Sequence, residues 1–345
     1  MSLRTSDFDF ELPADRIAQF PSPDREQSRL LVVDRNAESL TDRHFADIVD
    51  LFDPNDVLVV NETKVFPARL RGHRGGGGRA EVLLLHPVPG ESDLWEALVR
   101  PGSKLGAGKS IDVAPELAID IIGVLENGNR AVRLRTSLTF EEAVDRYGEV
   151  PLPPYVERPV EDSDRERYQT VYARESGSVA APTAGLHFTS GLLEAIEARG
   201  VAVARIVLHV GVGTFRPVDA DDPAEHRMHS EWYSVPAEAA DAINARRERG
   251  GRVWAVGTTA VRTLESVAGM SGHIPAGEGW TDIFIKPPYR FRVVDGLITN
   301  FHLPRSTLLM LVSALAGLDR TMEAYRHAID HGYRFYSYGD AMAII

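Results

Sequence analysis

Groups of histidine, amide, carboxylate and hydroxyl side chains stand directly after four apolar segments that are predicted strands. Such side chains exchange protons and form hydrogen bonds with a polar ligand, so together they suit acid–base chemistry on a small molecule. The four groups occupy residues 61–64, 209–214, 257–259 and 299–302. Because ligands of open α/β sheets bind beyond the carboxyl ends of the strands, we expect one composite site.

Two further features have competing interpretations. Residues 177–189 are mostly small and lack strand or helix periodicity, so their backbone can approach a ligand closely and His187 can reach it. The alternative is a tight structural loop in which His187 is packed. Residues 257–259 begin a helix and suit an anion or carboxylate bound by backbone N–H groups, but an ordinary threonine helix cap explains them equally well.

His226, His229 and Glu231 have a spacing that also suits a metal site, since two histidines three residues apart share one face of a helix. The neighbouring residues 219–223 look like a loop, and no further motif supports zinc. A metal-dependent hydrolase centred on these three residues is the alternative hypothesis. Nucleotide-binding glycine motifs are missing in the strand-to-helix context that they require.

The composition excludes several kinds of chemistry. The chain of 345 residues contains no cysteine, which excludes disulfides, thiolate zinc sites, iron–sulfur clusters and a cysteine nucleophile. Its net charge of −12 disfavours a general nucleic-acid binder but allows local basic patches.

Residues 64–79 are basic without an acidic side chain, and residues 286–292 combine basic and aromatic side chains. Such patches suit phosphates and unpaired bases, although a solvated charged face explains each patch equally well.

No segment indicates export or membrane insertion. Residues 1–15 are acidic and lack the cationic start and apolar core of a secretory signal. The longest apolar stretch, residues 308–318, is interrupted by Ser313 and Gly317 and is too short to span a bilayer. We therefore expect a soluble cytoplasmic protein.

The elements that would position these groups change along the chain. Residues 1–68 and 151–345 alternate short strands with helices, which is typical of an α/β layer with a largely parallel sheet. Residues 69–150 contain five strand-like segments separated by turn signals, followed by a helix with a capping box at Thr139 and Glu142. The pattern predicts a small antiparallel β-barrel inserted into a discontinuous α/β catalytic domain built from both chain ends.

Several segments resemble those of the S-adenosylmethionine:tRNA ribosyltransferase-isomerase family of queuosine biosynthesis. The resemblance extends from residues 10–13 to residues 337–341 and so covers nearly the whole chain. The most specific matching segments are residues 167–172, 180–189, 208–215, 229–231, 254–266, 299–304 and 306–310. One departure is Pro288, at a position where the family usually has glycine.

The resemblance implies an α/β domain interrupted by a β-barrel, and it also implies a reaction. The ribosyl part of S-adenosylmethionine is transferred to 7-aminomethyl-7-deazaguanine at the tRNA wobble position and rearranges to an epoxycyclopentanediol, giving epoxyqueuosine. Adenine and methionine are released. S-adenosylmethionine is thus a consumed substrate, no cofactor is expected, and the expected partners are this substrate and the tRNA. We expect a monomer.

Such a reaction needs a base near the ribose C5′ protons, which the sulfonium makes acidic, and a proton donor or hydrogen bond for the leaving adenine. We expect His187 and His209 to transfer protons, His229 to be a further catalytic residue, and Glu231 to contact the ribose or the sulfonium. The expected substrate-binding residues are Thr183, Gly185, Gly213, Thr214, Thr258, Thr259, Arg262, Glu265, Asn300 and His302. The methionine carboxylate is assigned to Thr258, Thr259 and Arg262. The expected tRNA-binding residues are Arg69, Arg71, Lys286, Tyr289 and Arg290.

Overall fold

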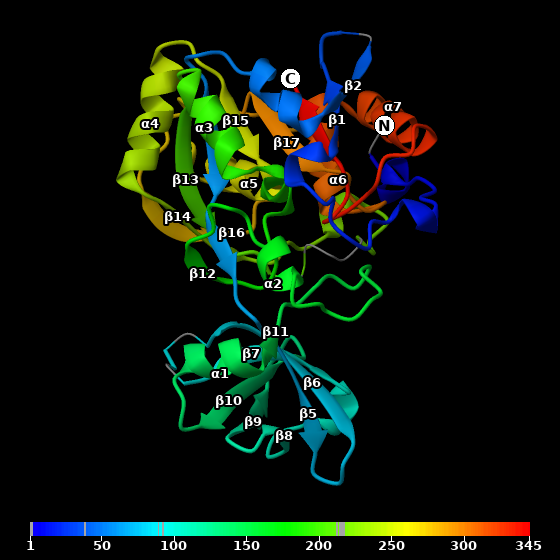
Figure 1. The fold of residues 1–345 in the computed structure, drawn as a ribbon, viewed down its shortest axis with the longest axis vertical. Helices are drawn as coiled ribbons and strands as arrows, with labels where there is room; N and C mark the ends of the chain where they lie inside the picture. The colour runs from blue at the N-terminus through cyan, green and yellow to red at the C-terminus, as the bar shows by residue number, and fades with distance from the viewer. Residues whose placement is uncertain (1–2, 38, 89, 92, 212, 214–217) are drawn as a thin grey trace.

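The structure, a computed structural model, describes residues 3–345 except Glu38, Pro89, Ser92, Val212 and residues 214–217. A mixed sheet with its helices occupies one end of the elongated molecule and a closed barrel occupies the other (Figure 1). Both chain termini lie in the part that holds the mixed sheet. Within the described residues, no helix is long and apolar enough to cross a membrane.

Nine strands from both ends of the chain form the mixed sheet, in the order β16-β14-β13-β3-β15-β17-β18-β1-β2. Their bounds are β1 Arg29–Val33, β2 Leu40–His44, β3 Val57–Asn61, β13 Ala202–Leu208, β14 Glu231–Val235, β15 Val253–Val256, β16 Gly277–Thr281, β17 Gly296–Asn300 and β18 Ala341–Ile344. The four central strands β13, β3, β15 and β17 pair in parallel, and antiparallel pairs join them to the outer strands on both sides. The predicted α/β class is confirmed, with a sheet that is parallel at its centre.

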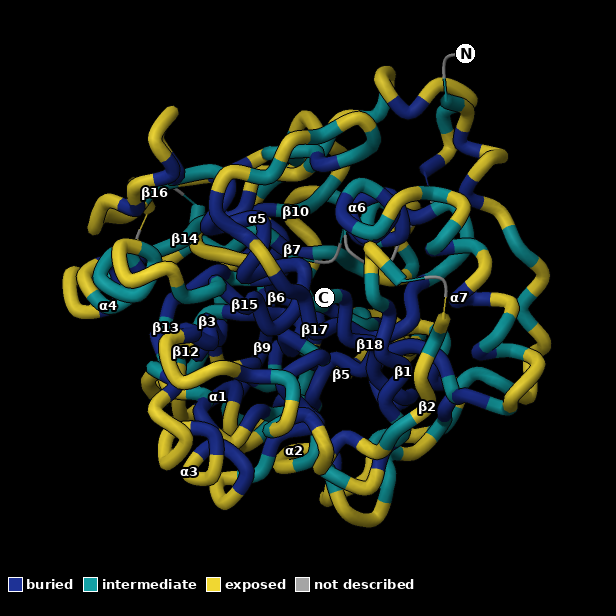
Figure 2. Tube along the Cα trace, turned by 90° about the horizontal axis from the view of Figure 1, so that it is seen from above, coloured by how far each residue is buried: buried dark blue, intermediate teal, exposed yellow. Residues whose placement is uncertain are grey.

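Alternating side chains along the central strands divide the core into two layers. On β3, Val57 and Val59 belong to one layer, whereas Leu58 and Val60 belong to the other. Helices α4 to α7 pack on the first face, and α3 packs with the 3-10 helix η4 on the second. Their bounds are α3 Ser190–Ala198, α4 Ala237–Glu248, α5 Gly257–Val267, α6 Thr307–Ala316, α7 Leu318–Asp330 and η4 Phe45–Leu51. Figure 2 shows the buried central strands surrounded by partly exposed helices.

Six antiparallel strands close into the barrel, in the order β5-β6-β7-β10-β9-β8, and β8 pairs back with β5. Their bounds, with the short β11 that pairs antiparallel with the start of β5, are β5 Arg69–Arg74, β6 Arg79–Pro87, β7 Trp95–Arg100, β8 Ser110–Ala114, β9 Leu117–Val124, β10 Arg130–Thr136 and β11 Gly148–Glu149. Helix α1 (Phe140–Tyr147) begins at Thr139, whose hydroxyl accepts from the Glu142 N–H as predicted. The predicted inserted barrel is confirmed, while the domain boundaries as such stay a prediction.

Three elements differ from the predictions. Residues 45–51, which form the helical segment between the first strands of the predicted alternation of strands and helices, adopt the 3-10 helix η4 rather than an α-helix. Strand β5 was not predicted, because Arg69, Arg71 and Arg74 dominate its pattern and indicate a charged surface. Strand β18 was also not predicted: it has only four residues, yet it is fully buried between β17 and β1.

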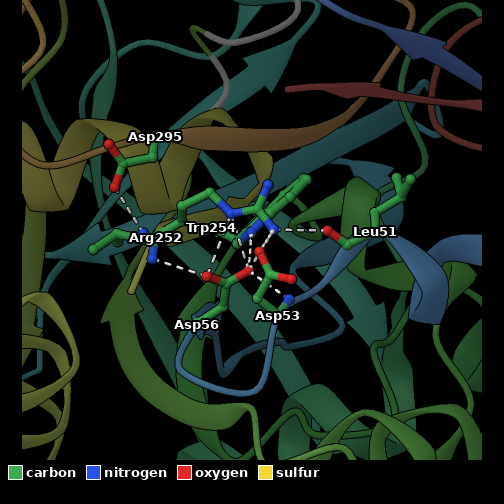
Figure 3. A network of polar contacts seen from close by, with 7 residues as sticks. Leu51, Asp53, Asp56, Arg252, Trp254 and Asp295 are labelled. Carbon is green, nitrogen blue, oxygen red and sulfur yellow. Dashed lines mark hydrogen bonds and ion pairs between the residues drawn. The ribbon is translucent and has the colours of Figure 1, made fainter. Parts of the chain in front are cut away.

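A buried carboxylate at the amino ends of β3 and β15 fixes these strands to each other (Figure 3). Asp56 is 1% exposed, and its oxygens accept from the Arg252 N–H at 2.8 Å, from Arg252 Nη2 at 2.8 Å and from Trp254 Nε1 at 3.0 Å. Asp295, which precedes β17, accepts from the first N–H of β15 at 2.9 Å. These contacts, the Asp56 clamp, therefore determine how far each central strand reaches at its opposite, carboxyl end.

Replacing Asp56 with Ala should lower the free energy of unfolding by about 3 kcal/mol, because it leaves a guanidinium and an indole N–H without their buried acceptor. Urea unfolding measures the change. The matched control is Asp53→Ala, because Asp53 is largely exposed and makes one contact with Arg252, worth less than about 1 kcal/mol. Equal effects of the two substitutions would contradict the role assigned to the clamp.

Candidate active site

The carboxyl ends of the central strands meet at one edge of the sheet, as the sequence predicts. Asn61 ends β3 and is buried; its Nδ2 donates to the Leu208 carbonyl at 2.9 Å, and its Oδ1 accepts from the Leu208 N–H at 3.0 Å. This amide aligns the ends of β3 and β13, so that His209 follows directly. Gly257 begins α5 immediately after β15, and Asn300 ends β17. The described residues of all four predicted groups are thus brought together.

Three cavities open at this edge. The inner cavity, of about 50 Å³, is lined by the start of α5 and by residues 299–303. The lateral cavity, of about 360 Å³, is lined by His226 and by the start of β14. The interdomain cleft, of about 640 Å³, lies between the barrel and the mixed sheet and is lined by His209.

The three cavities adjoin one another around the segment that follows His209. Val210 lines both the inner cavity and the interdomain cleft. Gly213, His229 and Glu231 line both the cleft and the lateral cavity. Thr214, a predicted substrate-binding residue of this segment, lies outside the described residues. A ligand larger than any one cavity can therefore occupy neighbouring ones.

The start of α5 forms one wall of the inner cavity. Gly257, Thr258 and Thr259 all line it and are buried, and no side chain caps the helix. Among the described residues, the buried hydroxyl of Thr259 has no hydrogen-bond partner. The first N–H groups of a helix lack partners within the helix and carry partial positive charge. This wall therefore suits a carboxylate, as predicted for Thr258 and Thr259, rather than an ordinary cap.

His187 lies in a buried network behind the inner cavity. Ser28 donates to the Arg25 carbonyl at 3.1 Å, so its oxygen accepts from His187 Nδ1 at 2.7 Å. The amide of Asn300 donates to His187 Nε2 at 3.1 Å. We assign the neutral Nδ1–H tautomer from these partners. Burial, reinforced by the neighbouring Arg334 and Arg25, lowers the pKa of His187 to about 3.

These contacts favour the packed interpretation of His187 over proton transfer. Both ring nitrogens are engaged, and the ring stacks on Phe45 with centroids 5.0 Å apart. The network instead holds Asn300, whose Oδ1 accepts from the Thr183 hydroxyl at 3.0 Å. Thr183 and Asn300 both line the inner cavity, which fits their predicted contact with substrate. A catalytic role of His187 stays a prediction.

Two other predicted residues have local partners. His302 lines the inner cavity, its Nε2 lies 2.8 Å from Thr299 Oγ1, and burial lowers its pKa to about 3. Gly185 is required by packing, because a Cβ at this position would lie 2.1 Å from the hydroxyl of Tyr172. We therefore expect a neutral His302 beside the ligand and a structural role for Gly185.

His209 is the histidine best placed for proton exchange. It lines the interdomain cleft, its Nδ1 lies 2.8 Å from the Thr63 hydroxyl, and its ring stacks on Trp232 with centroids 5.0 Å apart. Burial lowers the pKa of His209, although Glu175 acts in the opposite direction. A histidine with a lowered pKa is unprotonated near neutral pH and can accept a proton.

Glu231 and Arg262 form a buried ion pair between the cleft and the lateral cavity. The other carboxylate oxygen of Glu231 accepts from the Gly211 N–H at 2.9 Å. Separating such a pair would leave a buried charge uncompensated, so Arg262 is not a free ligand for a substrate carboxylate. The pair instead places Glu231 beside the segment that follows His209.

Glu265, an expected substrate-binding residue, has its hydrogen-bond partners within the protein. Its carboxylate accepts from the backbone N–H groups of Arg292, Val293 and Val294 and from the Tyr289 hydroxyl at 3.2 Å. Glu265 does not line the three cavities among the described residues. Its carboxylate anchors the loop that holds the second basic and aromatic patch, which favours a structural role.

The metal-dependent alternative is not supported. The carboxylate of Glu231 is committed to Arg262 and to the Gly211 N–H. The ring of His226 packs edge-on against Phe284, with centroids 5.6 Å apart. In the part of the chain that is described, no three His, Asp or Glu side chains could together hold a metal ion. His226 and His229 do not share a helix face, because a short 3-10 helix precedes them and residues 226–230 form no helix or strand.

The two patches predicted to bind tRNA are less basic in space than in sequence. Arg71 lies 3.7 Å from Glu81 and 3.2 Å from Glu149, and Arg69 donates to the Leu152 carbonyl at 3.1 Å. In the second patch, Tyr289 bonds Glu265, whereas Lys286 is partly exposed and Arg290 is exposed. Binding of tRNA by Arg69, Arg71, Lys286, Tyr289 and Arg290 stays a prediction.

One wall of the interdomain cleft was not found by sequence analysis. It belongs to the barrel and includes Trp95, Glu96, Asn127 and Asn129. The Asn-Gly step at Asn127 signalled only a turn. No sequence pattern indicates that a barrel strand and a hairpin turn face the same cavity as His209.

The chain was compared with known proteins. Residues 5–344 match the family model described as queuosine biosynthesis protein. A protein of Symbiobacterium thermophilum named S-adenosylmethionine:tRNA ribosyltransferase-isomerase is 54% identical over 99% of this chain and 100% of its own length. A protein of the same name from Moorella thermoacetica is 55% identical with the same coverage. The crystal structure of an S-adenosylmethionine tRNA ribosyltransferase from Thermotoga maritima is 38% identical, with a TM-score of 0.56 over 99% of this chain and 100% of that one.

The buried neutral state of His187 predicts a pH dependence of stability. The native pKa of about 3 lies below the usual value near 6.5, so the unfolded chain binds a proton that the native chain does not. The contribution of the neutral His187 to the free energy of unfolding should be complete above about pH 6.5. Below that pH the free energy of unfolding should fall by up to about 1.4 kcal/mol per pH unit. In His187→Gln this contribution should vanish between about pH 7 and 5 in urea unfolding. The control His273→Gln, at an exposed position, should keep the wild-type slope; a wild-type slope in His187→Gln would contradict the neutral state.

Proposed function

The chain belongs to the queuosine biosynthesis protein family, and we propose that it transfers and isomerises the ribosyl group of S-adenosylmethionine onto 7-aminomethyl-7-deazaguanine in tRNA. The observation that carries this proposal is the full-length similarity, at 54% and 55% identity, to proteins named for that activity. The product is epoxyqueuosine at the wobble position, with release of adenine and methionine. The contiguous cavities and the neutral His209 agree with such a reaction.

The bonds that change set the demands on the site. The C5′–S bond breaks with release of methionine, and the glycosidic bond breaks with release of adenine. The aminomethyl nitrogen forms a bond to the transferred five-carbon group and loses a proton. A new carbon–carbon bond closes the five carbons into the cyclopentane ring, and the ring oxygen of the ribose becomes part of the epoxide or of a hydroxyl group. The ribose C5′ carbon, which is next to the sulfonium, also has to lose a proton. The site therefore needs a neutral base near the ribose, and His209 in the interdomain cleft meets this need.

The methionine end of S-adenosylmethionine is assigned to the inner cavity. The start of α5 offers N–H groups and the unpartnered hydroxyl of Thr259, which together suit a carboxylate. The inner cavity is the smallest of the three, at about 50 Å³, so we assign to it the small amino-acid end rather than the nucleoside. The adenosine part is then directed toward Val210 and the interdomain cleft, where Glu231 and His209 lie.

Incubation of the protein with S-adenosylmethionine and tRNA carrying 7-aminomethyl-7-deazaguanine tests the function. Adenine and methionine should be released in equal amounts, and only when this tRNA is present. His209→Asn should lower turnover by about 100-fold or more, because it removes the base. The exposed His273→Asn is the matched control and should retain activity. Failure of the wild type to release adenine would contradict the function, whereas an active His209→Asn would contradict only the role of His209.

Replacing Thr259 with Val tests the carboxylate site, since it removes a hydroxyl and keeps the shape. The KM for S-adenosylmethionine should rise about 10-fold, because the substitution removes a hydrogen bond to a charged group. The KM for tRNA should change little. Thr263→Val is the control, because Thr263 lies one turn further along α5 and bonds only the helix backbone. Inhibition by methionine but not by methioninol in the wild type would support the same assignment; an unchanged KM in Thr259→Val would exclude it.

A further inference from the structure

We propose that the barrel wall of the interdomain cleft binds the base of the tRNA substrate, with Glu96 accepting hydrogen bonds from the N1–H and 2-amino groups of the deazaguanine. The inference rests on the proposed function, because it names the part of the site that selects the base. It also gives the inserted barrel a role in recognition, since the barrel supplies one wall of the pocket in which the mixed sheet supplies the chemistry.

The cleft has two chemically different walls. The barrel lies next to the edge of the mixed sheet that carries β14 and β16 (Figure 1). Glu96, Asn127 and Asn129 line the cleft from the barrel, whereas His209 and Glu231 line it from the mixed sheet. At about 640 Å³, the cleft is large enough for a purine-sized base together with the adenosine part of S-adenosylmethionine that is assigned to it. A base in the cleft therefore contacts both walls at once.

Glu96 is held in place before any ligand binds. It lies on β7, its side chain is 14% exposed, and its Oε1 accepts from Asn127 Nδ2 at 2.8 Å and from Asn129 Nδ2 at 2.6 Å. Its Oε2 is 3.7 Å from His86 Nε2, which is longer than a hydrogen bond. Two amides thus fix one oxygen and leave acceptor capacity on the carboxylate. An ionised carboxylate only accepts hydrogen bonds, so its ligand has to be a donor.

The deazaguanine base has the matching arrangement of groups. Its N1–H and 2-amino groups are adjacent donors on one edge, and the 7-aminomethyl group projects from the opposite side of the fused rings. When the donor edge meets Glu96 on the barrel wall, the aminomethyl group points toward the mixed-sheet wall, where His209 and Glu231 lie. Adenine and pyrimidines lack this pair of donors, so the arrangement selects a guanine-type base.

Aromatic side chains of the cleft suit an unpaired base. Trp95 lines the cleft next to Glu96 and stacks on Phe140 with centroids 4.2 Å apart and planes 5° apart. Trp280 also lines the cleft and is 59% exposed, an unusual state for a large apolar side chain. Proteins bind single-stranded bases by stacking them on such rings and by bonding their Watson–Crick edges. The cleft provides both contacts.

The test compares two anticodon stem-loop RNAs, one with 7-aminomethyl-7-deazaguanine and one with the analogue that lacks the 2-amino group. For the wild type, kcat/KM should be about 10-fold higher or more with the first RNA than with the analogue. A well-placed pair of hydrogen bonds to a base contributes discrimination of this size. In Glu96→Gln and Glu96→Ala this ratio should fall toward one. Because the ratio is taken within one protein, a smaller folded fraction does not alter it.

Glu126→Gln is the matched control, since Glu126 lies in the hairpin turn that carries Asn127 and Asn129, is exposed and is not among the described residues that line the cleft. It should keep the wild-type ratio, and all variants should bind S-adenosylmethionine as the wild type does. A wild-type ratio in both Glu96 variants, or no discrimination by the wild type, would overturn the inference. Failure of the wild type to convert either RNA would instead contradict the proposed function.

Discussion

The Asp56–Arg252 contact is the constraint on which the active-site edge depends. It joins residues that are 196 positions apart, at the amino ends of two parallel strands in the centre of the sheet. The length of each strand then decides where the chain leaves the sheet: β3 ends at Asn61, and β15 ends where α5 begins. A shift at the clamp would displace the helix start relative to Asn61, and the inner cavity would lose its shape.

Hydrogen bonding and burial divide the histidines of the site into two kinds. His187 and His302 are buried and hydrogen-bonded, so they remain neutral and fix the amide and hydroxyl groups around the inner cavity. His209 adjoins the cleft, and among the described residues its polar side-chain partner is the Thr63 hydroxyl, so it is well placed to exchange a proton with a ligand. The surrounding protein, rather than the residue type, determines which histidine does chemistry.

Sequence patterns predict the parts of this structure that depend on local chain properties. The apolar runs of β3, β13 and β15, the cap at Thr139 and the turn signals of the barrel predicted the α/β class and the inserted barrel, and they placed the polar groups at one edge of the sheet. Contacts between distant segments were not predictable. Nothing in the sequence indicates that Arg262 pairs with Glu231, that Glu265 anchors a loop, or that Glu96 faces the same cavity as His209. These outcomes follow from tertiary packing, which brings the partners together.

The chain enters and leaves the barrel at one place, next to the mixed sheet, because Arg69 at the beginning of the barrel pairs with Glu149 at its end. The two connections between the barrel and the mixed sheet therefore lie side by side, like the two ends of a hairpin turn. Insertion of the barrel thus costs little loop-closure entropy. Arg69 also bonds the carbonyl of Leu152 at 3.1 Å on the outgoing connector, so the two crossings behave as one stem. The stem therefore holds the barrel at a fixed place relative to the mixed sheet, so that the two walls of the interdomain cleft keep a constant spacing.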